Sequence, residues 1–158
     1  MKKLLKLLEK DAHLSPRDLA VMCEKEEGDI KKMIEDFEKR GVILGYTTVI
    51  DWDKTDTEYV NALIEQKVTP RVGSGYDEIA ERNYNYPEVE SVYLMSGGFD
   101  LAVMLRGKTM REVAIFVAAK LATIEAVTST ATHFVLRKYK DHNVIFGGAP
   151  VDERGNIL

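Results

Sequence analysis

The amino-acid sequence predicts an α+β fold in two domains, and three observations support this prediction. The first 41 residues hold three stretches in which apolar residues recur at helical spacing. Further on, two short apolar runs, residues 89–95 and 101–105, flank the sequence SGGFD. A Gly-Gly pair between such runs predicts a hairpin, because glycine reaches positive φ without a steric penalty, and we place its two strands at the centre of a sheet. A helical pattern on each side of the hairpin, with a strand beyond, gives the β-α-β-β-α-β order of a ferredoxin-like domain.

The composition is that of a globular protein with an acidic balance. The length of 158 residues suits one large domain or two small ones. The hydrophobic share of 45% is enough to form a core. The net charge of -4 means that any nucleic-acid binding must rest on a local basic patch. The single cysteine, Cys23, excludes an internal disulfide and fits a reducing compartment, so we expect a cytoplasmic protein. Lys6 and Glu9 interrupt the apolar N-terminus, which predicts a helix there and no signal peptide. No apolar run approaches about 20 residues, so we expect no membrane span.

The first domain, residues 1–50, begins with three predicted helices. Ser15 has the features of an N-cap, since Pro16 follows at the first helical position and Asp18 lies three residues on. The third helix opens on acidic residues, which suit the positive end of the helix dipole, and Gly41 ends it. The inner faces of the three helices are predicted to carry Leu4, Leu5, Leu7 and Leu8, then Leu19, Ala20, Met22 and Cys23, then Ile30, Met33, Ile34 and Phe37.

Residues 42–50 are predicted to form a strand pair around Gly45. Three short helices followed by a small hairpin are typical of a winged helix-turn-helix, in which the second helix of the turn presents its exposed face to the major groove of DNA. Here that face would carry Lys25, Lys31 and Lys32, with Lys39 and Arg40 near the DNA backbone. The competing interpretation is that these side chains only form a solvated helix face.

Residues 51–58 are polar and without clear period, which predicts a linker, although Trp52 within it is expected to pack. The second domain, residues 59–140, begins with a strand over residues 59–68. A Ser74…Asp77 pattern then predicts a helix, and Thr109 and Glu112 form a capping box for the next one. The last strand is predicted over residues 128–139, and residues 141–158 are predicted to be a polar C-terminal tail.

In this order and at this spacing, these pieces resemble the Lrp/AsnC transcription regulators, the leucine-responsive or feast/famine proteins, over most of the chain. Residues 15–23 stand where the family has its positioning helix, and residues 30–34 and 37–46 look like its recognition helix running into the wing. The SGGFD turn looks like the family's Ser-Gly-Asp-aromatic-Asp turn, and the last strand has the expected threonines. The resemblance implies a sequence-specific DNA-binding regulator whose second domain is a RAM-type domain for effector binding and dimerisation.

The resemblance further implies dimers through the sheets of the second domain, often assembled into octamers, with an amino acid or similar small effector bound between dimers. The candidate effector residues lie in the turn and on the last strand: Ser96, Gly97, Gly98, Phe99, Asp100, Thr130, His133 and Phe134. Simpler interpretations compete, because the glycines alone make a turn, Asp100 is suited to cap one, and His133 suits a structural role. The sequence predicts no metal site and no cofactor. Its histidines, His13, His133 and His142, lack ligand spacing, and no phosphate-binding loop is present.

Departures from the family leave other functions open. In residues 24–40 the acidic side chains outnumber the basic ones, with Glu26 at the cap place and Met33 and Asp36 where arginine is common. Fewer cations facing the phosphates weaken DNA binding, so an effector-binding assembly protein with weakened DNA binding is the second hypothesis. In the turn, Gly98 replaces an acidic residue while Asp100 remains. A third hypothesis, an enzyme on a fold similar to the siroheme decarboxylases, would need a cluster drawn from Arg106, Arg111, His133 and Arg137. We rank it last and expect no enzymatic activity.

Overall fold

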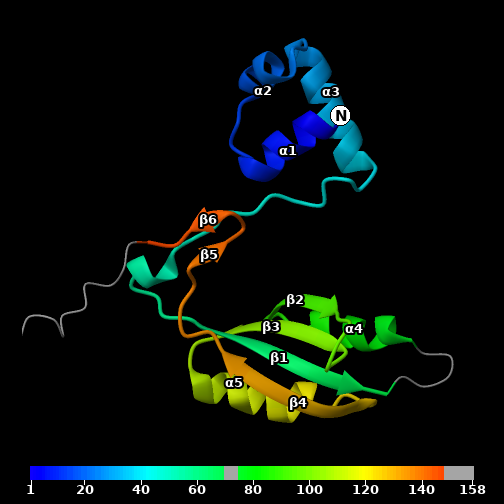
Figure 1. The fold of residues 1–158 in the computed structure, drawn as a ribbon, viewed down its shortest axis with the longest axis vertical. Helices are drawn as coiled ribbons and strands as arrows, with labels where there is room; N and C mark the ends of the chain where they lie inside the picture. The colour runs from blue at the N-terminus through cyan, green and yellow to red at the C-terminus, as the bar shows by residue number, and fades with distance from the viewer. Residues whose placement is uncertain (70–74, 148–158) are drawn as a thin grey trace, which may run out of the picture. The chain divides into compact units, whose positions relative to one another are not determined.

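The computed structural model describes residues 1–69 and 75–147, and within them the chain divides into two compact units (Figure 1). The first unit comprises Met1–Ile50 and Lys140–Ile145. The second comprises Asp51–Tyr139 and, of the described residues beyond it, Phe146 and Gly147. In the described part of the chain, no helix combines the length and the apolar character that crossing a membrane requires.

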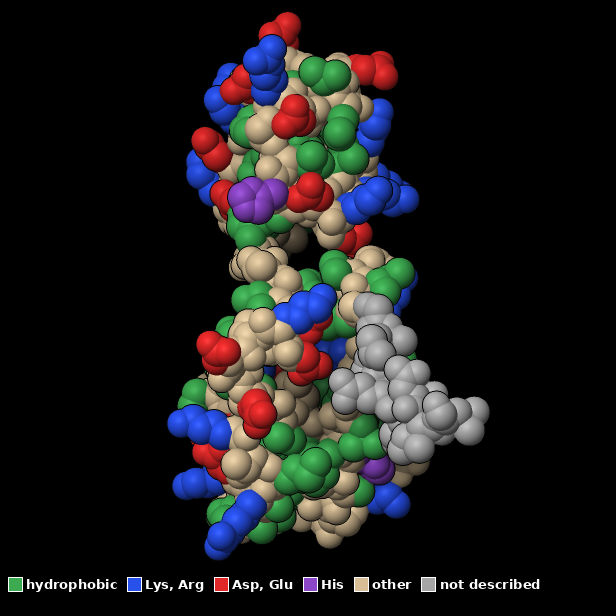
Figure 2. Space-filling model, turned by 90° about the vertical axis from the view of Figure 1, so that its left-hand side faces the viewer, with side chains coloured by type: hydrophobic (Ala, Val, Ile, Leu, Met, Phe, Trp, Pro, Cys, Tyr) green, Lys and Arg blue, Asp and Glu red, His purple; other side chains and the backbone are tan. Residues whose placement is uncertain are grey.

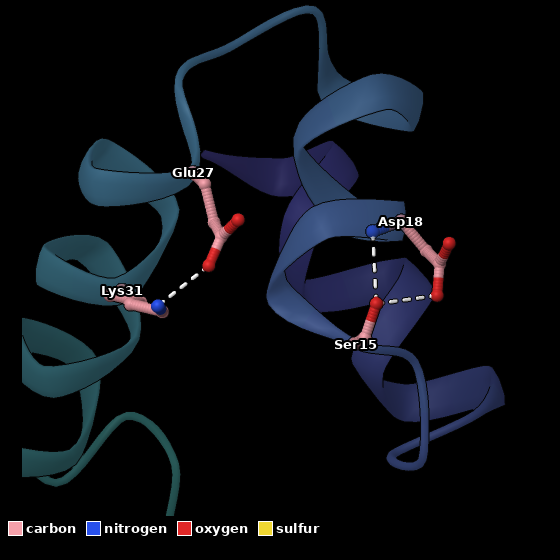
Figure 3. Close-up of polar contacts among 4 residues, drawn as sticks. All are labelled: Ser15, Asp18, Glu27 and Lys31. Carbon is pink, nitrogen blue, oxygen red and sulfur yellow. Dashed lines mark hydrogen bonds and ion pairs between the residues drawn. The ribbon is translucent and has the colours of Figure 1, made fainter.

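Three helices build the first unit: α1 (Lys2–Lys10), α2 (Pro16–Cys23) and α3 (Glu27–Lys39). The start of α2 is as predicted, because the Ser15 hydroxyl accepts the backbone N–H of Asp18 at 3.1 Å (Figure 3). Gly41, at φ +66°, ends the last turn after α3, again as predicted. The fully or largely buried core is Leu4, Leu19, Ala20, Ile30 and Phe37, whereas Met22, predicted to face inward, is 44% exposed.

The predicted strand pair over residues 42–50 is wrong, since the structure has no strand there. The start of this segment is used to terminate α3 instead: the backbone N–H groups of Val42 and Ile43 both donate to the Phe37 carbonyl. Further along, the Tyr46 hydroxyl donates to a Glu38 carboxylate oxygen at 2.9 Å. Partial burial, with the hydrogen bond and the negative charge of Glu38 adding to it, raises the pKa of the Tyr46 phenol. The segment is thus held against α3 by these individual hydrogen bonds rather than by a ladder.

A short hairpin from the C-terminal segment groups with the first unit. It consists of β5 (Lys140–Asp141) and β6 (Val144–Ile145), joined through His142 and Asn143 at φ +43° and +65°. Two consecutive residues at positive φ are the signature of a tight two-residue hairpin turn. The segment from residue 141, predicted as a polar tail, therefore begins with regular structure, and residues 148–158 of the predicted tail lie outside the described residues.

The second unit contains one four-stranded antiparallel sheet in the order β2-β3-β1-β4. Its elements are η1 (Trp52–Lys54), β1 (Val60–Val68), α4 (Tyr76–Tyr84), β2 (Val89–Leu94), β3 (Leu101–Gly107), α5 (Met110–Phe116), the π-helical η2 (Val117–Leu121) and β4 (Val127–Phe134). The β-α-β-β-α-β order is confirmed. The placement of the whole hairpin at the sheet centre is wrong, because β1 pairs with the far side of β3 and leaves β2 at the edge.

Both helices of this unit cover one face of the sheet. Alternate β1 residues, Ala62, Ile64 and Val68, join a buried cluster with Ile79 of α4 and Val113 of α5. The residues between them, such as Leu63 and Glu65, are only half-buried because they belong to the other face. Gly107, at the end of β3, allows α5 to approach: a Cβ there would lie 2.7 Å from Cγ2 of Val113.

Element ends in this unit follow from local chemistry. Thr109 caps α5 by accepting the N–H of Glu112 at 3.0 Å, and the Glu112 carboxylate accepts the N–H of Lys108 at 2.8 Å, close to the predicted capping box. β4 ends at Phe134, before the predicted residue 139, and Leu136 beyond it is 89% exposed. Ser74, the predicted cap of α4, lies outside the described residues, and Gly75 occupies the N-cap position without a side-chain hydrogen bond.

Candidate functional site

The outward face of α3 combines lysines with acidic residues. With Ile30 and Phe37 buried, residues spaced three and four apart on the opposite side are Gly28, Lys32, Glu35 and Lys39. Glu35 therefore lies between Lys32 and Lys39 on the outward ridge of α3, which is the part of the helix that would enter the major groove of DNA. Figure 2 shows the same mixture more widely, with blue and red side chains interspersed over the visible face of the helical unit.

Two of the five predicted DNA-binding cations are engaged by carboxylates of their own helix. Lys31 lies 2.6 Å from Glu27 (Figure 3), and Arg40 lies 2.9 Å from Asp36 and also over the Phe37 ring. Both pairs are exposed, and such pairs stabilise a helix by only about 0.2–0.5 kcal/mol, so a phosphate can replace the carboxylate. Lys25, Lys32 and Lys39 have no salt bridge to any described residue. The structure thus places all five cations on or beside α3.

The SGGFD turn is tied to the end of β1 through Asp100. The backbone N–H of Asp100 donates to the Gln66 carbonyl at 2.9 Å, and the Asp100 carboxylate accepts the N–H of Val68 at 2.8 Å. Gly97 is at φ +150°, a conformation that favours glycine, while Ser96, Gly97 and Gly98 are exposed and Phe99 is half-buried. The Asp100 carboxylate therefore bonds the end of β1 instead of capping its own turn, and three residues of the turn, Ser96, Gly97 and Gly98, remain open to solvent.

The strand β4 brings only one of its predicted effector residues level with the turn. Thr130 is the register partner of Gln66, which lies beside Leu101 at the start of β3. His133 and Phe134 pair with Leu63 and Ala62, about 10 and about 13 Å further along the strands at 3.3 Å per residue. Phe134 packs against the core, and Nε2 of His133 lies 3.2 Å from Glu65. One chain therefore does not gather all the predicted effector residues into one site.

Sequence reasoning missed a buried amide pair behind the turn. The side chains of Gln66 and Asn83 are both fully buried and exchange two hydrogen bonds of 3.0 Å, and the Asn83 amide also donates to the Ile79 carbonyl at 2.9 Å. This pair joins α4 to β1 at Gln66, whose backbone carbonyl accepts the N–H of Asp100. The sequence did indicate that Gln66 is buried, because it lies on the same face of the predicted strand as Ala62, Ile64 and Val68.

A cavity of about 620 Å³ lies at the other end of the sheet from the turn, between the end of β3, the start of β2 and α5. Its apolar lining includes Leu105, Val113 and Phe116. Of the residues considered for an enzyme, Arg106 lines this cavity, whereas Arg111, His133 and Arg137 do not belong to its lining. The described residues contain no group of three or more His, Cys, Asp or Glu side chains arranged to hold a metal ion.

Replacing Asp100 should separate its structural role from its charge. Asp100→Ala leaves the Val68 N–H without its acceptor, and we expect the free energy of unfolding to fall by about 1–3 kcal/mol. Asp100→Asn keeps an acceptor oxygen and should cost less than half as much. Urea unfolding at one protein concentration measures both. Equal destabilisation by the two variants would show that the carboxylate charge, and not the hydrogen bond, holds the turn.

Comparison with known proteins identifies the chain's relatives. The family model for the Lrp/AsnC ligand-binding domain matches residues 61–145. The uncharacterized HTH-type transcriptional regulator YugG of Bacillus subtilis is 44% identical over 96% of this chain and 92% of its own length.

Solved structures share the fold. The crystal structure of MtbAldR matches with a TM-score of 0.78 at 19% identity, covering 94% of this chain and 97% of that one. The transcriptional regulator NMB0573 of Neisseria meningitidis, solved as an L-Met complex, matches with a TM-score of 0.70 at 18% identity, covering 88% and 89%. The sequence resemblance is confirmed: the chain belongs to the Lrp/AsnC family of HTH-type transcriptional regulators, and its residues 61–145 match the family's ligand-binding domain.

Proposed function

We propose that residues 1–50 bind duplex DNA through α3, that residues 51–58 link them to the rest, and that residues 59–140 bind a small effector and pair with a second copy. The observation that carries DNA binding is the packing of α2 against α3 with Lys32 and Lys39 on the ridge of α3 that faces away from the core. In a helix-turn-helix that ridge enters the major groove. Such a role would place the chain in the cytoplasm with its DNA.

The effector we propose is an amino acid bound at the SGGFD turn. Two features support this: Ser96, Gly97 and Gly98 are exposed, and a neighbour in fold was solved with L-Met. Exposed backbone N–H groups of a glycine-rich turn suit the effector carboxylate. Because Asp100 is already bonded to Val68, we propose that a second copy supplies part of the site, with His133, on the sheet face opposite the helices, as the candidate.

Pairing of two copies is supported by the face of the sheet opposite the helix-packed cluster. Leu63 and Met104 are register partners on that face and remain half-buried in the single chain, and Tyr93 is 56% exposed. A second sheet laid on this face would remove these side chains from water. A two-fold dimer then presents two α3 helices to a roughly palindromic site, and an effector acts through its different affinities for two assembly states.

Gel retardation with the DNA upstream of the chain's own gene tests the proposal. We expect retardation of that fragment over an unrelated one, with affinity falling as salt rises because binding to phosphates releases counterions. Thermal shifts with the twenty amino acids test the effector in parallel. Equal, negligible retardation of all fragments at low salt would favour an effector-binding assembly protein, the role to which the carboxylates among the α3 lysines point.

A further inference from the structure

The cavity beside α5 has the size and lining of a small-molecule site. Its volume of about 620 Å³ lies within the roughly 300–1,000 Å³ range of ligand pockets. The half-buried Phe116 and the exposed Ile115 and Ala119 supply apolar surface, and Arg106, Lys108 and Lys120 supply cationic groups. Because it lies at the opposite end of β3 from the SGGFD turn, it is separate from the effector site proposed above.

The carboxylates of the lining are mostly occupied. Glu90 lies 2.5 Å from the Arg106 guanidinium, and Glu112 accepts the backbone N–H of Lys108. The ammonium groups of Lys108 and Lys120 have no salt bridge to any residue within 1–69 and 75–147. Moreover, Nε of Arg106 is buried and has no hydrogen-bond partner in that part of the chain. The lining as a whole carries three cationic and three acidic side chains, but within the described chain Lys108 and Lys120 are without a salt bridge, whereas Glu90 and Glu112 are bonded and leave Glu88 as the free carboxylate.

We infer that this cavity binds a small organic carboxylate with an apolar body. The body would lie on Phe116, Ile115 and Ala119, where its burial contributes about 25 cal/mol per Å². The carboxylate would accept charge-assisted hydrogen bonds from the free donors, Lys108 and Lys120 first. An added ammonium group would meet those same two lysines, with Glu88 as the free carboxylate of the lining to offset them, so the site favours the plain carboxylate over the amino acid with the same side chain.

Trp52, the single tryptophan of the sequence, reports on this cavity. Its ring stacks edge-to-face on Tyr59 with centroids 5.0 Å apart, and the Arg106 guanidinium lies 5.8 Å from its centroid. Tyr59 and Arg106 both line the cavity. A ligand that rearranges either side chain changes the surroundings of the indole, and its fluorescence emission should change with it.

The test is a titration of the full chain with phenylacetate, followed by Trp52 fluorescence and by calorimetry. We expect saturable binding, with phenylacetamide, which has the same body without the charge, weaker by about tenfold or more, since a charge-assisted bond contributes about 1.5–3 kcal/mol. L-Phenylalanine should also bind more weakly than phenylacetate. Hexanoate extends the test to an aliphatic body.

Four variants locate the site. Lys120→Met should weaken phenylacetate binding about tenfold, and Ala119→Phe should block it by filling the cavity; both positions are exposed, and thermal unfolding checks that the variants fold. Lys10→Met, the same charge change on α1, and Asp100→Asn, in the turn, should leave the affinity unchanged. The inference is overturned by equal affinity for phenylacetamide, by tighter binding of L-phenylalanine, or by no saturable binding of either carboxylate. Unchanged binding in Ala119→Phe or abolished binding in Asp100→Asn also overturns it.

Discussion

Replacing Lys31 and Lys32 together by glutamate should abolish retardation of operator DNA while leaving the oligomer and the helical unit intact. Both side chains are exposed on α3, and neither contributes to the core of Ile30 and Phe37. The folded unit loses the Lys31–Glu27 pair, about 0.2–0.5 kcal/mol, and the new carboxylates lie three or four residues from Glu27, Asp29, Glu35 and Asp36, each such like-charge pair costing a similar amount. These costs fall on exposed side chains, and the buried core of the unit is unchanged.

The expected fall in affinity is on the order of a hundredfold or more. Each charge-assisted hydrogen bond to a phosphate contributes about 1.5–3 kcal/mol, and 1.4 kcal/mol corresponds to tenfold in affinity. For every phosphate that the variant no longer neutralises, the slope of log affinity against log salt should flatten by about 0.9. Retardation measured over a series of salt concentrations gives both quantities, and size-exclusion chromatography checks the oligomer.

Two variants control for net charge. Lys2→Glu with Lys3→Glu makes the same change on α1, and we expect it to preserve most of the affinity. Glu35→Gln, between Lys32 and Lys39 on the outward ridge, should strengthen binding, because it removes a carboxylate that repels phosphate. Equal weakening by the α1 and α3 double variants would mean that net charge, and not the α3 surface, governs binding. An unchanged affinity in Lys31→Glu/Lys32→Glu would remove both lysines from the interface.

The helices and strands that carry their own local signals were predictable from the sequence. Ser15 and Thr109 cap their helices through hydrogen bonds to residues three positions on, so a four-residue window contains the whole interaction. Gly41 and Gly97 adopt positive φ, as glycine at a helix end or hairpin predicts. The ferredoxin-like class of the second unit followed from its succession of elements, because few topologies accommodate β-α-β-β-α-β.

The predictions that failed did so for two reasons. Residues 42–50 have the composition of strands, but the N–H groups of Val42 and Ile43 are taken by the Phe37 carbonyl at the nearby end of α3. β2 lies at the edge because β1 takes the other side of β3, a pairing that no local pattern encodes. The two sites differ in the same respect. The cations of α3 are near one another in sequence and could be predicted, whereas the cavity joins the start of β2, the end of β3 and α5 and could not.

Replacing Asn83 by leucine should destabilise the second unit by about 3 kcal/mol, more than Gln66→Leu does. The side chains of Gln66 and Asn83 are both fully buried, so an amide that loses its partner cannot form hydrogen bonds with water instead. Asn83→Leu leaves both the oxygen and the NH₂ of Gln66 unbonded. Gln66→Leu leaves the Asn83 amide with its hydrogen bond to the Ile79 carbonyl, so fewer buried polar atoms are unsatisfied.

The double variant Gln66→Leu/Asn83→Leu should be more stable than Asn83→Leu alone, although it carries one more substitution. Removing both amides leaves no unsatisfied side-chain amide and places two apolar groups in an apolar core, which is close to neutral in free energy. Urea unfolding of the four proteins at one protein concentration completes the double-mutant cycle, with the midpoint as readout and the m-value as a check on the denatured state. Additive destabilisation would mean that each amide acts alone. A strong coupling, together with weaker amide-exchange protection at Asp100 in Asn83→Leu, would show that α4 holds the turn in place through Gln66, whose carbonyl accepts the Asp100 N–H.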